Sequence, residues 1–304
     1  MNKGKPSSPT QLLFPKNDFV FKLLFGSDTP QSKELLLHFL NDVFNIPESY
    51  SLAAVQLLNP HFDKRHLQDK QIALDIHARI PGEGYINIEM QLANQYNIDK
   101  RSLYYSSQII SGQVQKSEKY KLLRKTTTIN LLYFNYFPHP HYHNIYHLTE
   151  KRTGIPYTDL LQLHFIEMKK FENLQQSGTT IEEQDRLAKW IRFLTNEDDS
   201  MWEHLAQEHP IINKAVNYLK EISENSMNRW YYEMRQKAIM DMDSMMEGAR
   251  EEGEAKGRTE GKTEGKVEVA IRMLRKGVDL DIIMEFTGFS KAEILEIQNN
   301  LFKD

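Results

Sequence analysis

The chain has 304 residues, of which 40% are hydrophobic and 26% charged, and its formal net charge is −4. This composition is typical of a folded globular protein, and the negative balance excludes a general electrostatic attraction to nucleic acid. The absence of cysteine excludes thiol nucleophiles, disulfides and cysteine-bound zinc.

The N-terminal third predicts two helices and one hairpin. Apolar residues recur at helical spacing over 17–28 and 32–44, and Ser32 is the expected N-cap of the second helix. The segments IALDIHARI (72–80) and YINIEMQL (85–92) alternate apolar and polar residues on either side of the turn sequence PGEG. They predict an antiparallel β-hairpin with one apolar face and one polar face.

The middle of the chain predicts a helix and three strands. From Asp99 to about Lys125 apolar positions are spaced among polar ones, and a long helix is expected over DKRSLYYSSQIISGQVQK (99–116), with Gly112 as its weak point. The segment TTINLLYFNYF (127–137) is almost continuously β-branched or aromatic, which predicts a strand buried on both faces. Two further strands are expected at 143–150 and 160–168, and helices follow from about residue 170.

The C-terminal tract differs in composition. Glycine recurs every four residues at Gly253, Gly257, Gly261 and Gly265, within a run of alternating charge. Each glycine costs a helix up to about 1 kcal/mol relative to alanine, so a charged, flexible or partly helical spacer is favoured over a helix-packing face. Three short helices are expected after it, and the last two have helix-turn-helix proportions.

The polar face of the hairpin carries two carboxylates. If its turn centres on Gly82, Asp75 lies opposite Glu89; if it centres on Glu83, Asp75 lies opposite Gln91. Opposed carboxylates repel unless a cation or a proton lies between them, and Mg²⁺ is the natural candidate because it takes oxygen ligands. The alternative is a solvated polar face, which is common on half-exposed antiparallel sheets.

An ordered set of segments resembles the Rpn family of recombination-promoting nucleases and transposases, within the PD-(D/E)xK nuclease superfamily. The segments are NDFVFKLLFG, LLLHFLNDVF, DKQIALDIHA, INIEMQ, DKRSLYYSSQIISGQV and TTINLLYFNYF. The similarity covers roughly residues 15–170, and the glycine tract also resembles that family. It implies an α/β fold with a restriction-endonuclease-like core, a mixed central sheet flanked by helices, and an all-helical C-terminal extension.

The resemblance also implies roles for residues of the hairpin. Asp75 and Glu89 become catalytic acids and metal ligands, with the backbone carbonyl of Met90 as a third ligand. The implied cofactor is Mg²⁺, with Mn²⁺ and Ca²⁺ as alternatives. Gln91 stands where the superfamily motif has lysine. Because glutamine is neutral, it can only orient the attacking water, and we expect slower cleavage than in a lysine-bearing enzyme.

Basic residues around the expected long helix are candidates for contacts to DNA phosphates, which position a protein without reading sequence. The candidates are Lys70, Lys100, Arg101, Lys116, Lys119, Lys121, Arg124 and Lys125. Without the resemblance, a solvated helix face explains the same pattern. His139, His141 and His143 alternate with prolines and other residues in HPHYH, which favours a polar loop over a zinc site.

These patterns predict five parts of the chain. They are a flexible tail at 1–14, a nuclease-like domain at 15–170, a helical extension at 171–250, a glycine-rich charged spacer at 251–266, and a small helix-turn-helix-like module at 267–304.

The leading functional hypothesis is a Mg²⁺-dependent DNA endonuclease linked to recombination or mobile-element movement. The alternative is a non-catalytic DNA-binding or regulatory protein that retains the nuclease fold. The N-terminus has no apolar run of signal-peptide length, and no segment reaches the roughly 18 apolar residues that span a bilayer. We therefore expect a cytoplasmic protein with DNA as its partner and no membrane contact. A homo-oligomer formed through the C-terminal helices is a further expectation.

Overall fold

The computed structural model describes residues 11–59, 61–62, 72–73, 75–94, 96–115, 117–178 and 185–301. The chain divides into two compact units, Met1–Arg235 and Gln236–Asp304. Among the described residues, no helix has the length and hydropathy that a membrane span requires.

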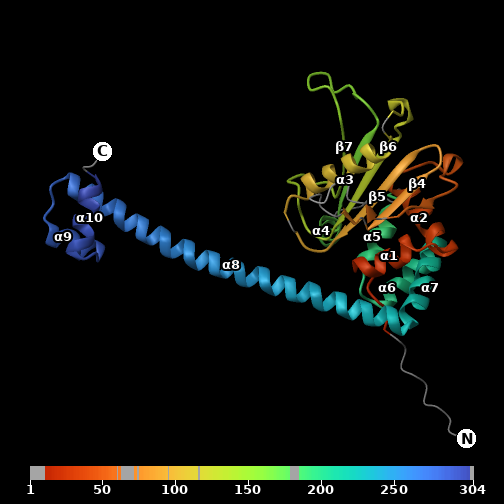
Figure 1. Ribbon diagram of the computed structural model, residues 1–304. Helices are drawn as coiled ribbons and strands as arrows, with labels where there is room; N and C mark the ends of the chain where they lie inside the picture. The colour runs from red at the N-terminus through yellow and green to blue at the C-terminus, as the bar shows by residue number, and fades with distance from the viewer. Residues whose placement is uncertain are drawn as a thin grey trace, which may run out of the picture. The chain divides into compact units, whose positions relative to one another are not determined.

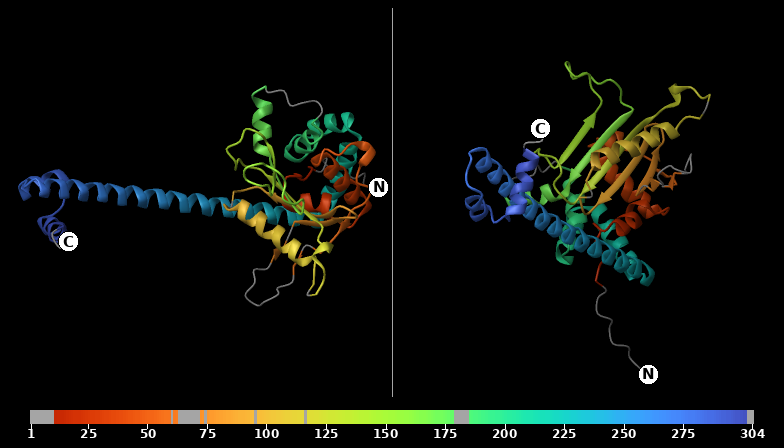
Figure 2. Two further views of the ribbon diagram at one scale, coloured as in Figure 1. Left: turned by 90° about the horizontal axis from the view of Figure 1, so that it is seen from above. Right: turned by 60° about the vertical axis from the view of Figure 1, so that its left-hand side comes forward.

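The described residues of the first unit build a six-stranded mixed sheet with the strand order β1-β4-β5-β6-β8-β7 (Figure 1). Its strands are β1 (Gln56–Leu57), β4 (Ile76–Ile80), β5 (Gly84–Gln91), β6 (Lys125–Leu132), β7 (His143–His147) and β8 (Leu161–Glu167). Strands β5, β6 and β8 are parallel neighbours, and the other pairs are antiparallel. A separate two-stranded ladder joins β2 (His61–Phe62) and β3 (Ile72–Ala73). Figure 2 shows the main sheet from two further sides.

One face of this sheet is covered by helices that share a large apolar core with it. The helices are α1 (Asp18–Gly26), α2 (Pro30–Val43), α4 (Met168–Gln176), α5 (Ala188–Thr195), α6 (Asp199–Glu208) and α7 (Pro210–Glu224). The apolar face of the β4–β5 hairpin lies in the same core, where Ile76, Ala78 and Ile88 are almost fully buried. The alternation seen in the sequence therefore predicts the buried face correctly.

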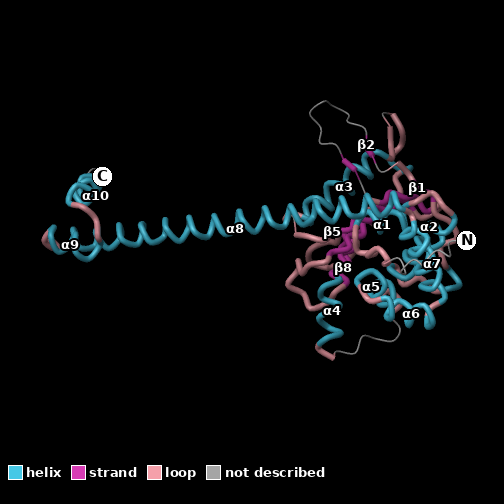
Figure 3. Tube along the Cα trace, turned by 90° about the horizontal axis from the view of Figure 1, so that it is seen from below, coloured by secondary structure: helices cyan, strands magenta, loops and turns pink. Residues whose placement is uncertain are grey.

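The opposite face of the sheet is covered by α3 (Ile98–Gly112), which contacts β6 and β8. Polar side chains fill this interface: the Ser106 hydroxyl lies 2.8 Å from the Thr128 hydroxyl, and the Asn130 amide donates to Ser102 at 3.0 Å. On the polar face of the hairpin, His77, Asn87 and Glu89 are buried, whereas Arg79 is exposed. Figure 3 shows the helices in cyan around the magenta strands of this unit.

The mixed sheet and its flanking helices confirm the predicted α/β fold, but several elements differ in extent. The helix expected over 99–116 ends at Gly112, the position that the sequence marks as its weak point. The Gln113 side chain then accepts from Arg124 N at 2.6 Å and donates to Arg124 O at 3.1 Å. This pair of hydrogen bonds folds the following segment back toward β6, which begins at Lys125.

Two local predictions are also corrected. The expected N-cap of the second helix, Ser32, lies inside α2. Thr29 is the cap instead, because its hydroxyl accepts from Ser32 N and Pro30 occupies the first turn. Ser32 is buried and its hydroxyl accepts from Ser27 N, which closes the connection between α1 and α2. The strand expected over 72–80 is divided into β3 and β4, so that Asp75 lies just before β4.

Helix α8 (Ser226–Arg275) is continuous through the glycine tract, where a partly flexible spacer was expected. Added Cβ atoms at Gly253 and Gly257 would meet nothing within 4 Å among the described residues, so close packing within this chain does not explain the glycines. Exposed pairs four residues apart, such as Arg250–Glu254, support the helix by a few tenths of a kcal/mol each. Good helix formers at the intervening positions offset the remaining glycine cost.

The second unit has its own small core. Ala270 of α8 packs with Ile283 of α9 (Leu280–Thr287) and Ile294 of α10 (Lys291–Leu301). Gly288 ends α9 in the left-handed conformation, as glycine readily does. Ser290 and Glu293 then exchange hydrogen bonds in a capping box that starts α10.

Candidate active site

The two predicted acids meet at one end of the β4–β5 hairpin. Ile76 pairs with Ile88 and His77 with Asn87, which is the register with the turn centred on Gly82. Continuing that register places Asp75 opposite Glu89. The Asp75 N–H lies 3.4 Å from Glu89 Oε1, and Asp75 Oδ2 accepts from Met90 N at 2.8 Å.

Glu89 lies in a polar environment that is shielded from solvent. Its side chain is 4% exposed, beneath α3. Burial and the negative charge of Asp75 raise the pKa of Glu89 well above its ordinary value, against smaller opposing effects of Arg101 and Asn87. A buried acid pair of this kind is electrostatically unfavourable unless a proton or a cation joins it.

A lysine from α1 reaches the carboxylate of Asp75. Lys22 Nζ lies 2.8 Å from Asp75 Oδ1, and the lysine side chain is 42% exposed. One turn earlier on the same helix, Asp18 forms an ion pair with Arg235 of α8. Through these contacts α1 borders the acids on the side of the sheet that faces the core.

Helix α3 borders the acids on the other side. Arg101 and Tyr105 are one turn apart, with the guanidinium 6.0 Å from the centre of the tyrosine ring. Both interact electrostatically with Glu89: Arg101 lowers its pKa, and Glu89 adds to burial in raising the pKa of Tyr105. The site is therefore enclosed between α1 and α3 at the carboxyl end of β5.

Comparisons with known proteins bear on this geometry. Residues 15–249 match the family described as PD-(D/E)XK nuclease family transposase. This match covers more than half of the chain, including the sheet, the acid pair and both bordering helices.

The chain belongs to this nuclease family.

A second match, over residues 263–299, is to the C-terminal helix-turn-helix domain of the Rpn/YhgA-like nuclease family. The two matches confirm the predicted relationship. No curated protein and no solved structure gave a significant match.

Members of PD-(D/E)XK families typically use divalent metal ions, and the acid pair has suitable chemistry for one. Among the described residues no cluster of three or more His, Asp or Glu side chains could hold a metal ion. Asp75 and Glu89 would supply two carboxylate ligands to such an ion, and further ligands would come from backbone carbonyl oxygen, Gln91 and water. Mg²⁺ commonly binds proteins through one or two carboxylates and keeps several waters, so this donor set fits such an ion.

Gln91 is the last residue of β5, two positions beyond Glu89 and therefore on the same face of the sheet. It is partly exposed, and its backbone carbonyl accepts from Tyr133 N at 2.9 Å.

The candidate DNA-contacting residues are not gathered in one place. Arg101 borders the acids, and Lys100 is exposed beside it, with its ammonium 3.1 Å from Asn97 Oδ1. Lys70 and Lys116 lie outside the described residues.

The remaining candidates lie toward the other end of the sheet. Lys119, Lys121 and Arg124 are exposed between α3 and β6, and Lys125 pairs with Gly84 at the start of β5. Gly84 precedes Glu89 by five residues, which is roughly 16 Å along a strand. Contacts from these residues to DNA stay a prediction, and they would involve phosphates distant from the cleaved one.

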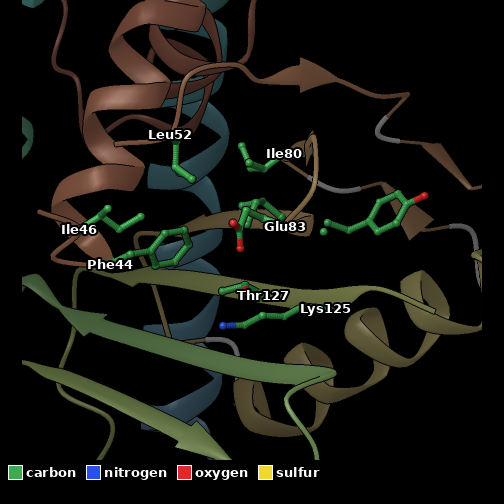
Figure 4. A pocket seen from close by; sticks show the side chains of 10 residues that line it. Phe44, Ile46, Leu52, Ile80, Glu83, Lys125 and Thr127 are labelled. Atoms are coloured by element: carbon green, nitrogen blue, oxygen red, sulfur yellow. The ribbon is translucent and has the colours of Figure 1, made fainter. Parts of the chain in front are cut away.

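A small cavity marks that far end of the sheet. It is lined by Phe44, Leu52, Ile80, Glu83 and Lys125, among others. Figure 4 shows the Glu83 carboxylate and the Lys125 ammonium directed toward this space. The cavity is separate from the acid pair and lacks its paired carboxylates.

Sequence reasoning missed Lys22 and did not place Arg101 at the acids. Lys22 was visible as the lysine of NDFVFKLLFG, on the polar side of an amphipathic helix and four residues after Asp18. That signal shows an exposed charge, but it does not show that the charge lies over Asp75, more than 50 positions later in the chain.

Proposed function

We propose that this member of the nuclease family is a Mg²⁺-dependent endodeoxyribonuclease. The observation that carries the proposal is the buried acid pair, Asp75 and Glu89, at the end of the hairpin beside Lys22. Two carboxylates held close together at the edge of an enclosed polar site destabilise the protein. Binding of a cation gives a physical reason for the protein to retain them.

The residues have separate roles in this proposal. Asp75 and Glu89 bind the cation, and the Met90 carbonyl joins them. Because N–H and C=O of one strand residue point toward the same neighbouring strand, the Met90 N–H bond to Asp75 supports a nearby carbonyl. A divalent cation bound there lowers the pKa of water and offsets negative charge on the phosphate.

The reaction is hydrolysis of a phosphodiester. A water oxygen attacks phosphorus, the bond from phosphorus to one ester oxygen breaks, and that oxygen takes a proton while the attacking water loses one. Gln91 orients the water through its amide, since a neutral amide cannot accept its proton. Arg101 supplies positive charge to a bound phosphate from α3.

Nicking of supercoiled plasmid tests the proposal. We expect wild-type protein to nick with Mg²⁺ and not with EDTA, and Asp75→Ala to be inactive under both conditions. DNA binding by the wild-type protein with no nicking in Mg²⁺ or Mn²⁺ contradicts the endonuclease proposal.

A second candidate function is DNA binding without catalysis. The observations in its favour are the neutral Gln91 and the helix-turn-helix match at 263–299. In that case Asp75→Ala leaves every measured property of the DNA complex unchanged. A role in recombination or mobile-element movement, a cytoplasmic location, and oligomerisation through the C-terminal helices stay predictions. Light scattering of the full chain tests the last of these.

A further inference from the structure

Strand β5, which carries Glu89 and Gln91, has no cationic side chain, because glutamine stands at position 91. A phosphate under attack gains negative charge, and a fixed positive group beside it lowers the barrier. Gln91 cannot supply that charge. The structure, however, holds an ammonium group against the acids from a different element, at 2.8 Å from Asp75 Oδ1.

We propose that Lys22 of α1 contacts the scissile phosphate and supplies the positive charge that a lysine at position 91 would otherwise provide. This inference rests on the proposed nuclease function. It assigns this positive side chain to the first helix of the domain, in addition to Arg101 of α3, while Gln91 keeps only the orienting role.

The backbone that carries Lys22 is firmly placed. Phe21 and Leu24 of α1 are fully buried in the main core. Gly26 lets the helix approach β4 closely, because a Cβ there would lie 3.1 Å from Ile76 Cγ1. A side chain on such a helix can present a charge at a defined position, as a phosphate contact requires.

The ion pair contributes little to stability, which leaves its position unexplained by folding alone. With 42% of the lysine side chain exposed, the pair belongs to the class of half-solvated salt bridges that contribute from about 0 to 1 kcal/mol. Asp75 Oδ2 already has a backbone donor in Met90 N–H. Removing the ammonium group should therefore leave the fold and the hydrogen bond of Asp75 intact.

The geometry also predicts that removing the Lys22 ammonium group strengthens metal binding while it slows cleavage. Lys22 and a bound cation compete for the same Asp75 oxygen and repel one another. A variant without the ammonium group should bind a divalent ion more tightly, by about threefold, the factor that a half-exposed ion pair is worth. If Lys22 only supported the fold, its replacement would lower both the metal affinity and the cleavage rate.

The experiment compares the full-length wild type with Lys22→Gln and Lys22→Arg. The matched control is Lys33→Gln, because Lys33 is a lysine of similar exposure (38%) paired with an aspartate, Asp28, outside the site. Three quantities are measured for each protein: Mn²⁺ affinity by calorimetry without DNA, the rate of plasmid nicking in Mg²⁺, and the thermal unfolding midpoint.

We expect Lys22→Gln to nick about 100-fold more slowly than wild type, a typical loss for one stabilising group in a transition state. Its Mn²⁺ affinity should be equal or higher, and its unfolding midpoint should match that of Lys33→Gln. Lys22→Arg, which keeps the charge, should retain more activity than Lys22→Gln. The double variant Lys22→Gln/Gln91→Lys should regain at least part of the lost rate, because it returns an ammonium group to the motif position.

Two outcomes overturn the proposal while the nuclease function stands. In the first, Lys22→Gln nicks at the wild-type rate while Asp75→Ala is inactive. In the second, Lys22→Gln and Lys22→Arg lose Mn²⁺ binding and unfold at lower temperature together, which identifies a structural residue. If the wild-type protein shows no metal-dependent nicking, the proposed function itself is wrong, and this inference fails with it.

Discussion

Replacing Glu89 with glutamine is expected to stabilise the metal-free protein while abolishing cleavage. The wild-type carboxyl is 4% exposed and lies beside Asp75. Burial first, and the charge of Asp75 second, raise its pKa from 4.5 to about 8. Glutamine has the same shape and can still accept a hydrogen bond at Oε1, so the change removes the charge with little change in packing.

The size of the effect follows from linkage. A carboxyl with a raised folded-state pKa contributes its full stability below pH 4.5, and loses it as pH rises toward 8 because the unfolded chain releases the proton more readily. At pH 7 the loss amounts to about 3 kcal/mol. For a unit of this size that corresponds to roughly 6–12 °C in the unfolding midpoint. Glu89→Gln avoids this loss, so the difference between variant and wild type should be largest at pH 7–8 and disappear near pH 4.5.

Thermal unfolding with EDTA across pH 4.5–8, followed by near-ultraviolet circular dichroism, measures the effect. Addition of Mg²⁺ should raise the midpoint of wild type and leave that of Glu89→Gln unchanged, since the variant has lost a ligand. Glu34→Gln is the matched control, because Glu34 is a half-exposed surface acid paired with Lys214. A Glu89→Gln midpoint equal to or below wild type at pH 7, or a difference that does not vary with pH, refutes the reasoning.

Three further predictions concern stability. Gly84→Ala should destabilise the first unit by more than about 3 kcal/mol in urea unfolding, because Gly84 has φ +143° and an added Cβ would lie 2.1 Å from the Lys125 carbonyl oxygen. Burial lowers the pKa of His164 to about 3, so the contribution of this residue to stability should fall as pH drops below 6.5, by about 2 kcal/mol at pH 5, and the stability difference between wild type and His164→Phe should change accordingly between pH 7 and 5. Glu167→Ala should cost about 3–5 kcal/mol, since the fully buried carboxylate pairs with Lys170 at 2.7 Å and accepts from Tyr136 N and Phe137 N, so its removal takes the counter-charge from the ammonium and the acceptor from both N–H groups.

Each of these has a clear contrary result. A Gly84→Ala variant as stable as wild type would show that the β5–β6 pairing relaxes easily. A stability difference between wild type and His164→Phe that is the same at pH 5 and pH 7 would show that His164 gains a proton in the folded state without cost. Equal urea midpoints for Glu167→Ala and wild type would show that the buried carboxylate contributes nothing net.

Local sequence patterns predict much of the fold. Period-two alternation in 72–80 and 85–92 identified the hairpin, its apolar face and the shared face of Asp75, Glu89 and Gln91, because successive strand residues always point to opposite sides. The helices α1 and α2 were recognised for the same kind of reason, since their apolar residues follow the helical period. Element ends were less well predicted: Thr29 displaced Ser32 as a cap, and Gln113 ended α3 through hydrogen bonds to a residue 11 positions later.

The sequence by itself determined that two carboxylates and an amide share one face of a hairpin, and its resemblance to a nuclease family assigned them a chemistry. Only the tertiary structure decided that Glu89 on this face is buried, that the register opposes Asp75 with Glu89, and that Lys22 reaches Asp75 from α1. The physical reason is the separation along the chain between the residues that set each property. Periodicity reports which side of its own element a residue occupies, whereas burial, pKa and ion pairing depend on segments that the packing of the whole core brings together.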